Sequence, residues 1–280
     1  MSYKIILDSC GELPEKLKND EHFEIVPLGL EVGEYQIMDD ENFNQKEFLQ
    51  KVAQSKTCPK SSCPSPERYM KAYQTDADNI YVVTLSANLS GSHNSAILGK
   101  NLYHEAHGEK NIHIVDSCSA SCGETQIALL AQELEEEGRH TFTEIVERLE
   151  KYRDSMHTYF ILDNLETLRK NGRLSAVKAI IASTLSIKPV MGANSEGVIL
   201  QHSQAIGMKK GIQKMADLIV KEAGNSAEKR LMITHCNCPD RAQYTKEMLE
   251  KKADWREIVI MDTAGISSMY ANDGGIIVTV

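Results

Sequence analysis

The sequence has no run of about 18 consecutive apolar residues, the length that a transmembrane helix needs, so no membrane span is expected. Its first apolar stretch, from Ile5 to Leu7, is too short for the core of a signal peptide and is followed by the acidic Asp8. Lysine and arginine never occur in clusters longer than two residues, and the formal net charge is −9 at pH 7. Because a phosphate backbone is bound through clustered basic side chains, we expect no nucleic-acid partner.

The sequence also lacks the regularly spaced cysteines of a disulfide-linked or zinc-binding domain. It has seven cysteines, an odd number, and no secretion signal, so we expect reduced thiols and a cytoplasmic location. Cys118 and Cys122 do not have the Cys-x-x-Cys spacing of a redox pair. Neither His104 with His107 nor the His-Cys-Asn-Cys segment at 235–238 has the spacing of a zinc site, so no metal and no cofactor are expected.

The length and the order of apolar patterns predict an α/β protein. A chain of 280 residues exceeds the roughly 100–200 residues of one ordinary domain, so we expect two domains that share a cleft. The first half alternates β-rich runs with amphipathic helical stretches, which is typical of a parallel sheet covered by helices. The predicted strands are Tyr3 to Asp8, Phe23 to Leu30, Asn79 to Leu85 and Asn111 to Asp116. The predicted helices cover about 44–54, 66–75, 92–106, 124–137 and 141–154.

The pattern changes near residue 156. A strand from His157 to Leu162 is followed by two helical stretches and by a β pattern interrupted at 194–197, where Asn-Ser-Glu-Gly is typical of a hairpin turn. The remaining elements are predicted as helices at about 208–223 and 239–252 and strands at 230–234, 257–261 and 275–280. We therefore expect an N-terminal parallel α/β domain, residues 1–156, and a C-terminal α+β domain, residues 157–280, with a mostly antiparallel sheet.

Hydroxyl-rich segments follow the predicted strands, where ligands bind in open α/β sheets. They are Asp8-Ser9-Cys10, residues 60–66, residues 86–92 and residues 116–119. Two of them lead directly into helices, whose free N–H groups and dipole favour an anion. Ser61, Ser62, Ser90 and Ser92 can each donate a hydrogen bond, and Gly91 lets the backbone approach a ligand closely. The sequence predicts a socket for a carboxylate or phosphate, with helix capping as the alternative role of each serine.

Several other chemistries are less well supported. The segment around Ser90 has no lysine or arginine and no phosphate-loop pattern, so a singly charged carboxylate suits it better than a nucleotide does. Ser92 precedes His93, but there is no Gly-x-Ser-x-Gly elbow, and we assign no catalytic residue. The alternative that stays open is an enzyme acting on a small acidic or phosphorylated metabolite in the interdomain cleft, with Asp8 or Asp116 as the base.

Short motifs occur in a definite order over essentially the whole chain. They are Ile6-Leu7-Asp8-Ser9 with Glu12-Leu13-Pro14, Val26-Pro27-Leu28, Ser61-Ser62-Cys63-Pro64-Ser65, Leu89-Ser90-Gly91-Ser92 with Ser95-Ala96, Val115-Asp116-Ser117, Leu165-Glu166-Thr167-Leu168, Gly172-Arg173-Leu174-Ser175 and Ile187-Lys188-Pro189. Each motif alone is weak, but their order and spacing together resemble the DegV family, bacterial two-domain proteins that bind long-chain fatty acids.

The resemblance implies a lipid-binding carrier, not an enzyme. It implies a fatty acid in a tunnel between the domains, with its carboxylate held by Ser61 with the adjoining Ser62, and by Ser90 with the adjoining Gly91 and Ser92. It also implies presentation of that carboxylate to a separate fatty acid kinase, which forms the acyl phosphate. A regulatory module whose occupancy signals lipid state is a further possibility.

The chain departs from the family pattern at three places. One is the lack of the basic residue that some members carry near the strand after the hairpin, since residues 201–207 contain only His202 as a possible cation. Cys63 stands where the family usually has Gln, and Tyr270-Ala271-Asn272-Asp273-Gly274 stands where it has a His-Thr-Gly-x-Gly segment. If Tyr270 occupies the position of that histidine, its hydroxyl can reach the carboxylate, but a neutral phenol cannot supply the charge of an imidazolium. The resemblance also makes Arg173 a candidate for docking of the kinase.

Burial of the acyl chain would dominate the affinity for such a ligand. Each buried methylene contributes about 0.8 kcal/mol, so roughly 14 methylenes supply on the order of 11 kcal/mol before the costs of binding. An unpaired carboxylate would cost several kcal/mol, so the hydroxyl groups fix the orientation of the ligand.

Overall fold

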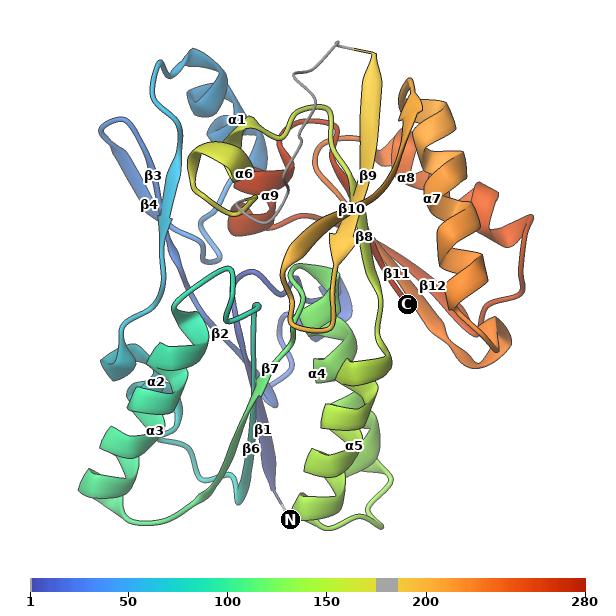
Figure 1. Ribbon diagram of the computed structural model, residues 1–280. Helices are drawn as coiled ribbons and strands as arrows, with labels where there is room; N and C mark the ends of the chain where they lie inside the picture. The colour runs from blue at the N-terminus through green and yellow to red at the C-terminus, as the bar shows by residue number, and fades with distance from the viewer. Residues whose placement is uncertain (1, 175–185) are drawn as a thin grey trace.

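The N-terminal part of the chain forms a sheet of four parallel strands in the order β2-β1-β6-β7 (Figure 1). The computed structural model describes residues 2–174 and 186–280. The strands are β1 (Tyr3–Asp8), β2 (Phe23–Val26), β6 (Asn79–Thr84) and β7 (Asn111–Asp116). Every residue of β6 is buried, which is typical of a parallel strand covered on both faces. The predicted parallel sheet is therefore confirmed.

The predicted strand from Phe23 to Leu30 is wrong, because the structure divides it between two sheets. β2 ends at Val26, and Pro27 follows, which has no N–H to donate to a ladder. The chain then enters a small antiparallel sheet in the order β4-β3-β5, which the sequence did not reveal. Its strands are β3 (Gly29–Val32), β4 (Tyr35–Met38) and β5 (Lys60–Ser62). This sheet carries Ser61, which lies opposite Leu30.

The C-terminal part forms a six-stranded sheet in the order β10-β9-β8-β13-β11-β12. Its strands are β8 (Thr158–Ile161), β9 (Ile187–Ala193), β10 (Ile199–Ile206), β11 (Arg230–His235), β12 (Glu257–Asp262) and β13 (Ile276–Thr279). The sheet is mixed: β11 and β12 are parallel, because the helix between them returns the chain to the same end, and the other neighbouring strands are antiparallel. The predicted hairpin at 194–197 joins β9 to β10 and is confirmed.

Helices cover both faces of the first sheet, and helices also pack against both faces of the second (Figure 1). They are α1 (Gln45–Gln54), α2 (Pro66–Ala72), α3 (Ser92–His107), α4 (Cys122–Glu136), α5 (Phe142–Ser155), α6 (Glu166–Lys170), α7 (Met208–Glu222), α8 (Pro239–Glu250) and α9 (Gly265–Ala271), with 3-10 turns at Glu15–Leu17 and Ser226–Glu228. Side-chain caps explain where two of these helices begin. Asn44 accepts a hydrogen bond from Glu47 N at the start of α1, and Thr141 forms a capping box with Glu144 in α5.

Helix α4 lies between the two larger sheets and packs against both. It contacts β1 and β6 on one side and β11 and β13 on the other. Ile127 and Leu134 of α4 and Met232 of β11 belong to one hydrophobic cluster. Gln126 Nε2 also donates to the carbonyl oxygen of Arg230, at 2.9 Å. The two sheets therefore share one core, and a division into two domains near residue 156, between α5 and β8, stays a prediction.

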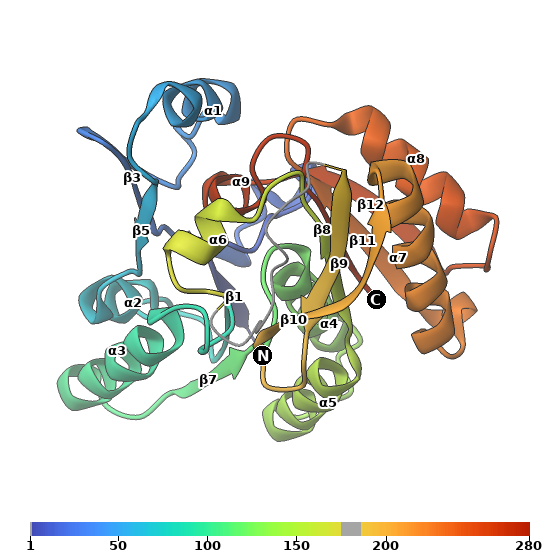
Figure 2. The ribbon, with the colours of Figure 1, turned by 45° about the horizontal axis from the view of Figure 1, so that its top comes forward.

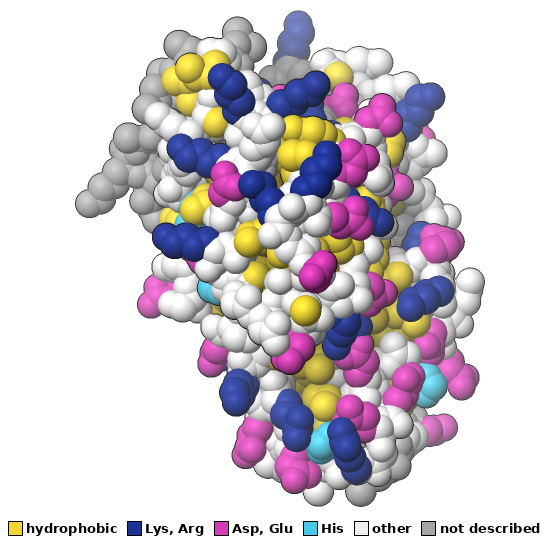
Figure 3. Space-filling view, turned by 90° about the vertical axis from the view of Figure 1, so that its right-hand side faces the viewer, with side chains coloured by type: hydrophobic (Ala, Val, Ile, Leu, Met, Phe, Trp, Pro, Cys, Tyr) yellow, Lys and Arg dark blue, Asp and Glu magenta, His cyan; other side chains and the backbone are white. Residues whose placement is uncertain are grey.

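Two short helices of the C-terminal part, α6 and α9, lie side by side (Figure 2). Of the two helical stretches predicted after residue 162, α6 is the first, and a helix at 175–185 would lie outside the described residues. None of the helices in the described part of the chain is long and apolar enough to cross a membrane. On the face seen in Figure 3, acidic and basic side chains are interspersed.

Candidate functional site

A cavity lies where the carboxyl ends of the first sheet's strands face the second sheet. The space between its lining residues, open solvent included, is about 810 Å³. Its apolar lining comes from both parts of the chain and includes Leu28, Leu85, Leu89, Phe160, Leu162, Leu168, Ile199, Ile266 and Ile277. A lining of this kind favours a ligand with a long apolar portion.

Two hydroxyl groups that are distant in the sequence meet at this cavity. Ser61 of β5 and Tyr270 of α9 both line it, and Ser61 Oγ lies 3.1 Å from Tyr270 Oη. One hydroxyl donates to the other, so the pair has one further O–H hydrogen for a ligand. Ser90 also lines the cavity, and its Oγ accepts a hydrogen bond from Ser92 N at 3.2 Å, which does not use its hydrogen. These hydroxyls can together donate to an anion.

Arg173 supplies a positively charged side chain to the lining of the same cavity. It lines the cavity, its Nε donates to the carbonyl oxygen of Leu89 at 3.1 Å, and its Nη1 donates to that of Asn171. Leu89 precedes Ser90, and both Arg173 and Ser90 line the cavity. Sequence reasoning placed Arg173 at a docking surface for a partner and missed this position, because no local pattern links it to the Ser90 segment. Its role in docking stays a prediction.

Three of the six predicted ligand-binding residues do not belong to the lining. Side chains alternate along a strand, so Ser61 of β5 faces the cavity, whereas Ser62 lies against Gly29 of β3. Gly91 lies against Cys63, whose Sγ would be 3.1 Å from a Cβ at that position. The sequence could not indicate which of two adjacent serines faces the ligand.

Ser92 is the third of these residues, and it is fully buried. Its Oγ donates to Asp8 Oδ2 at 2.6 Å and lies 2.7 Å from Tyr69 Oη. Ser92 therefore ties the first turn of α3 to the end of β1 and has no free hydroxyl for a ligand.

Asp8 is a brace between strand ends. Its side chain is fully buried; Oδ1 accepts a hydrogen bond from Cys10 N at 3.1 Å, and Oδ2 accepts one from Leu85 N at 3.0 Å besides that of Ser92. Burial raises the pKa of Asp8, while these hydrogen bonds act in the opposite direction. The carboxylate holds three segments of the site together and is not among the residues that line the cavity.

Asp116 braces the neighbouring loops in a simpler way. One oxygen, Oδ1, accepts hydrogen bonds from Ala87 N at 3.1 Å and from Cys118 N at 3.0 Å. Asp116 is likewise not among the lining residues. Neither aspartate is therefore placed to act as a base on a ligand in the cavity.

The tip of the β9–β10 hairpin closes one side of the cavity. Ser86 Oγ donates to the carbonyl oxygen of Gly197 at 2.9 Å, and Asn88 Nδ2 donates to that of Glu196 at 2.7 Å. Gly197 has φ +74°, and a Cβ at this position would lie 2.8 Å from Cys118 Cα. Only glycine fits this turn and this close approach. The hairpin therefore fastens the second sheet to the loops of the first.

Three buried carboxyl groups lie behind the cavity near Cys10. Burial raises the pKa of Glu12 to about 7 and that of Asp39 to about 6. Burial and the neighbouring Asp8 raise the pKa of Glu124 well above its ordinary value. Among the described residues, neither carboxyl oxygen of Glu124 has a hydrogen-bond partner. Burial of both oxygens without a partner therefore favours the neutral form of Glu124 over the charged form.

The raised pKa of Glu12 predicts a stability that falls as the pH rises. At pH values between the ordinary pKa of Glu12 and the raised one, the folded state binds more protons than the unfolded state does. The wild type should therefore lose about 3 kcal/mol of unfolding free energy from pH 5 to pH 8. A Glu12→Gln variant should not show this loss. Urea unfolding of both proteins across this range measures the difference. The variant is needed because His202 and His235, whose pKa values burial lowers, act in the opposite direction. Parallel curves for the two proteins would contradict the prediction.

The neighbours of His235 give it a structural role. Its Nδ1 accepts a hydrogen bond from Cys238 N at 3.4 Å and lies 3.4 Å from Asp262 Oδ1. Within residues 2–174 and 186–280, no group of three or more histidine, cysteine, aspartate or glutamate side chains could hold a metal ion.

Comparisons with known proteins match this chain from end to end. The sequence model described as "Uncharacterised protein, DegV family" matches residues 2–279. A "DegV domain-containing protein" from Streptococcus gordonii is 35% identical over 281 residues, which cover 99% of this chain and 98% of that protein.

Solved structures show the same fold. A DegV family protein from Ruminococcus gnavus, refined with vaccenic acid, is 53% identical with a TM-score of 0.97, and the match covers 100% of both chains. The Fatty Acid Kinase (Fak) B3 protein from Streptococcus pneumoniae, loaded with linoleic acid, is 32% identical with a TM-score of 0.85, over 100% of this chain and 99% of that one. The chain belongs to the DegV family.

Proposed function

We propose that this protein binds one long-chain fatty acid in the cavity between its two larger sheets. The observation that carries the proposal is an apolar cavity whose lining includes the hydroxyls of Ser61, Ser90 and Tyr270 and the guanidinium of Arg173. An apolar lining suits an acyl chain, and clustered donors suit a single carboxylate. The fatty acids in the related structures from Ruminococcus gnavus and Streptococcus pneumoniae support the same ligand class.

The carboxylate accepts hydrogen bonds from Ser90 and from the Ser61–Tyr270 pair in this proposal. Arg173 supplies the positive charge that Tyr270 cannot, because its nitrogens lie beside the Ser90 segment. Water-exposed carboxylates are strongly hydrated, so this combination of donors and charge offsets the loss of hydration on binding.

The protein presents the bound carboxylate to a fatty acid kinase and does not itself catalyse a reaction. The similarity to the Fatty Acid Kinase (Fak) B3 protein supports such a partner. Ser61, Ser90 and Tyr270 offer hydroxyl groups to the cavity. The described residues that line it include no aspartate, glutamate, histidine or lysine that could act as a general base. Formation of the acyl phosphate would therefore depend on groups of the kinase.

Mass spectrometry after denaturing extraction of the freshly purified protein tests the binding proposal. We expect about one fatty acid per chain, because burial of the acyl chain makes dissociation slow. The delipidated protein should bind vaccenic or linoleic acid again and bind the corresponding methyl ester more weakly, because the ester has no negative charge for the donors. An empty protein that binds neither acid after delipidation would refute the proposal.

A further inference from the structure

The Ser61–Tyr270 pair joins residues that lie 209 positions apart in the sequence, so something must hold their two elements in register. Ser61 is fixed by a strand ladder: β5 pairs with β3, and Ser61 lies opposite Leu30. Tyr270 lies near the end of α9, a helix of seven residues. A helix this short has little stability of its own, so its position depends on contacts from outside.

Asp39 provides such contacts at the first turn of α9. Its Oδ1 accepts a hydrogen bond from Gly265 N at 2.7 Å, and its Oδ2 accepts one from Ile266 N at 2.8 Å. The side chain is buried, with 3% of its surface exposed. Tyr270 follows Ile266 by four residues, so it lies on the same face of the helix, about 6 Å further along the axis.

Asp39 also belongs to the sheet that carries Ser61. It follows β4 directly, β4 pairs with β3 through Gly29 and Met38, and Asp39 N donates to the carbonyl oxygen of Leu28 at 2.9 Å. One three-stranded sheet thus fixes Ser61 through β5 and reaches the helix of Tyr270 through Asp39.

We propose that Asp39 is a positioning residue for the carboxylate-binding pair: it holds α9 at the spacing from β5 at which Tyr270 meets Ser61. The inference rests on the proposed fatty-acid site. Asp39 touches no ligand itself and acts through Tyr270.

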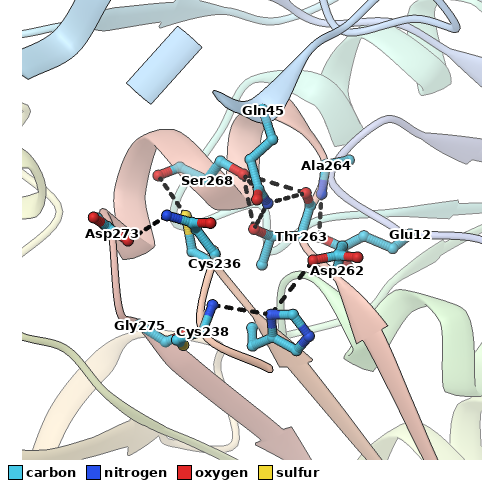
Figure 4. Close-up of polar contacts among 12 residues, drawn as sticks. Glu12, Gln45, Cys236, Cys238, Asp262, Thr263, Ala264, Ser268, Asp273 and Gly275 are labelled. Atoms are coloured by element: carbon cyan, nitrogen blue, oxygen red, sulfur yellow. Dashed lines mark hydrogen bonds and ion pairs between the residues drawn. The ribbon is translucent and has the colours of Figure 1, made fainter. Parts of the chain in front are cut away.

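Two other side chains hold the same end of α9 but do not connect it to Ser61. Glu12 Oε1 accepts a hydrogen bond from Ala264 N at 3.3 Å. Gln45 Nε2 donates to the carbonyl oxygen of Thr263 at 2.9 Å and to Ser268 Oγ at 3.1 Å (Figure 4). Glu12 follows β1, and Gln45 begins α1, so neither belongs to the three-stranded sheet.

The surroundings of Gly265 show how closely Asp39 fits the helix. A Cβ at Gly265 would lie 2.5 Å from Asp39 Oδ1 and 2.6 Å from Leu30 Cδ1. A Gly265→Ala substitution must therefore displace the carboxylate from the helix, while its charge remains. This variant separates the position of Asp39 from its chemistry.

A double-mutant cycle tests the proposal, with Asp39→Asn, Tyr270→Phe and the double variant compared with the wild type for binding of [1-¹³C]oleic acid. Asparagine keeps one acceptor oxygen but turns its amide hydrogens toward a backbone N–H of α9. We expect Asp39→Asn and Tyr270→Phe each to weaken binding about tenfold, and the double variant to bind no more weakly than Tyr270→Phe alone.

The ¹³C shift of the bound carboxyl group gives a readout that a general loss of stability would not change. It should move in the same direction in both variants, because Tyr270→Phe removes the Tyr270 hydroxyl and Asp39→Asn displaces it from Ser61. The control is Glu144→Gln, which removes the charge of a capping carboxylate on α5 and should leave both affinity and shift unchanged.

Losses of affinity that add in the double variant would overturn the role of Asp39, as would a folded Asp39→Asn protein with wild-type affinity and carboxyl shift. If Asp39→Asn does not fold, Gly265→Ala takes its place in the cycle with the same expected result. Failure of the wild-type protein to bind oleic acid would contradict the proposed function, a result distinct from either of these.

Discussion

Replacing Ser61 and Ser90 together by alanine should weaken fatty-acid binding by at least about 100-fold. A hydrogen bond to a charged group contributes about 1.5–3 kcal/mol, and the double variant removes two donors from the proposed carboxylate site. The acyl chain would still be buried, so binding should be weakened and not abolished. Isothermal titration of the delipidated proteins with a long-chain fatty acid measures the change.

Ser62→Ala is the matched control for this experiment. Ser62 is adjacent to Ser61, but its side chain lies against Gly29 and is not part of the cavity lining. The Ser62→Ala protein should bind as the wild type does. Equal losses from Ser62→Ala and from the Ser61→Ala/Ser90→Ala variant would show that the alternation along β5 is not what selects the ligand-binding serine.

Asp8→Asn should lower the free energy of unfolding by about 3 kcal/mol, because an amide cannot accept hydrogen bonds at both of its positions and at least one buried donor loses its partner. In the wild type, Oδ1 accepts from Cys10 N, and Oδ2 accepts from Leu85 N and Ser92 Oγ. Urea unfolding followed by circular dichroism measures the loss as a lower midpoint with an unchanged slope.

Asp116→Asn provides the comparison, since one oxygen of Asp116 accepts both of its hydrogen bonds and asparagine can keep them. We expect a change of less than about 1 kcal/mol for this variant. The pair also addresses the alternative of an enzyme with an aspartate base. Turnover of a small acidic metabolite that both substitutions abolish, in proteins as stable as the wild type, would favour the enzyme and contradict the structural role of Asp8.

The sequence predicts the parallel sheet well because each of its strands is a short stretch rich in β-branched and other apolar residues. It does not predict the division of the segment from Phe23 to Leu30, where the missing N–H of Pro27 outweighs the apolar pattern. It also does not predict α9. The carboxylate that caps this helix belongs to Asp39, 226 residues earlier, so no local signal marks its start.

In the candidate site, the sequence likewise does not show which individual side chains face the ligand. Sequence motifs identified the segments of Ser61, Ser90 and Tyr270, and the structure brings all three to one cavity. The motifs did not show whether Ser61 or Ser62, or whether Ser90 or Ser92, lines the cavity, because this depends on strand pairing and on the direction of a helix. The guanidinium of Arg173 also belongs to this cavity and is held there by a contact with Leu89, 84 residues away, which no local pattern reveals.

The position of α4 between the two larger sheets affects how the chain can fold during its synthesis. The helix leaves the ribosome before β11 and β13, which form one of its two packing surfaces. Until those strands are made, that surface of α4 stays exposed, and the N-terminal sheet is covered by a helix that is only half packed. Nascent chains of this protein therefore depend on the segment from β11 to β13 to complete a core that begins at β1.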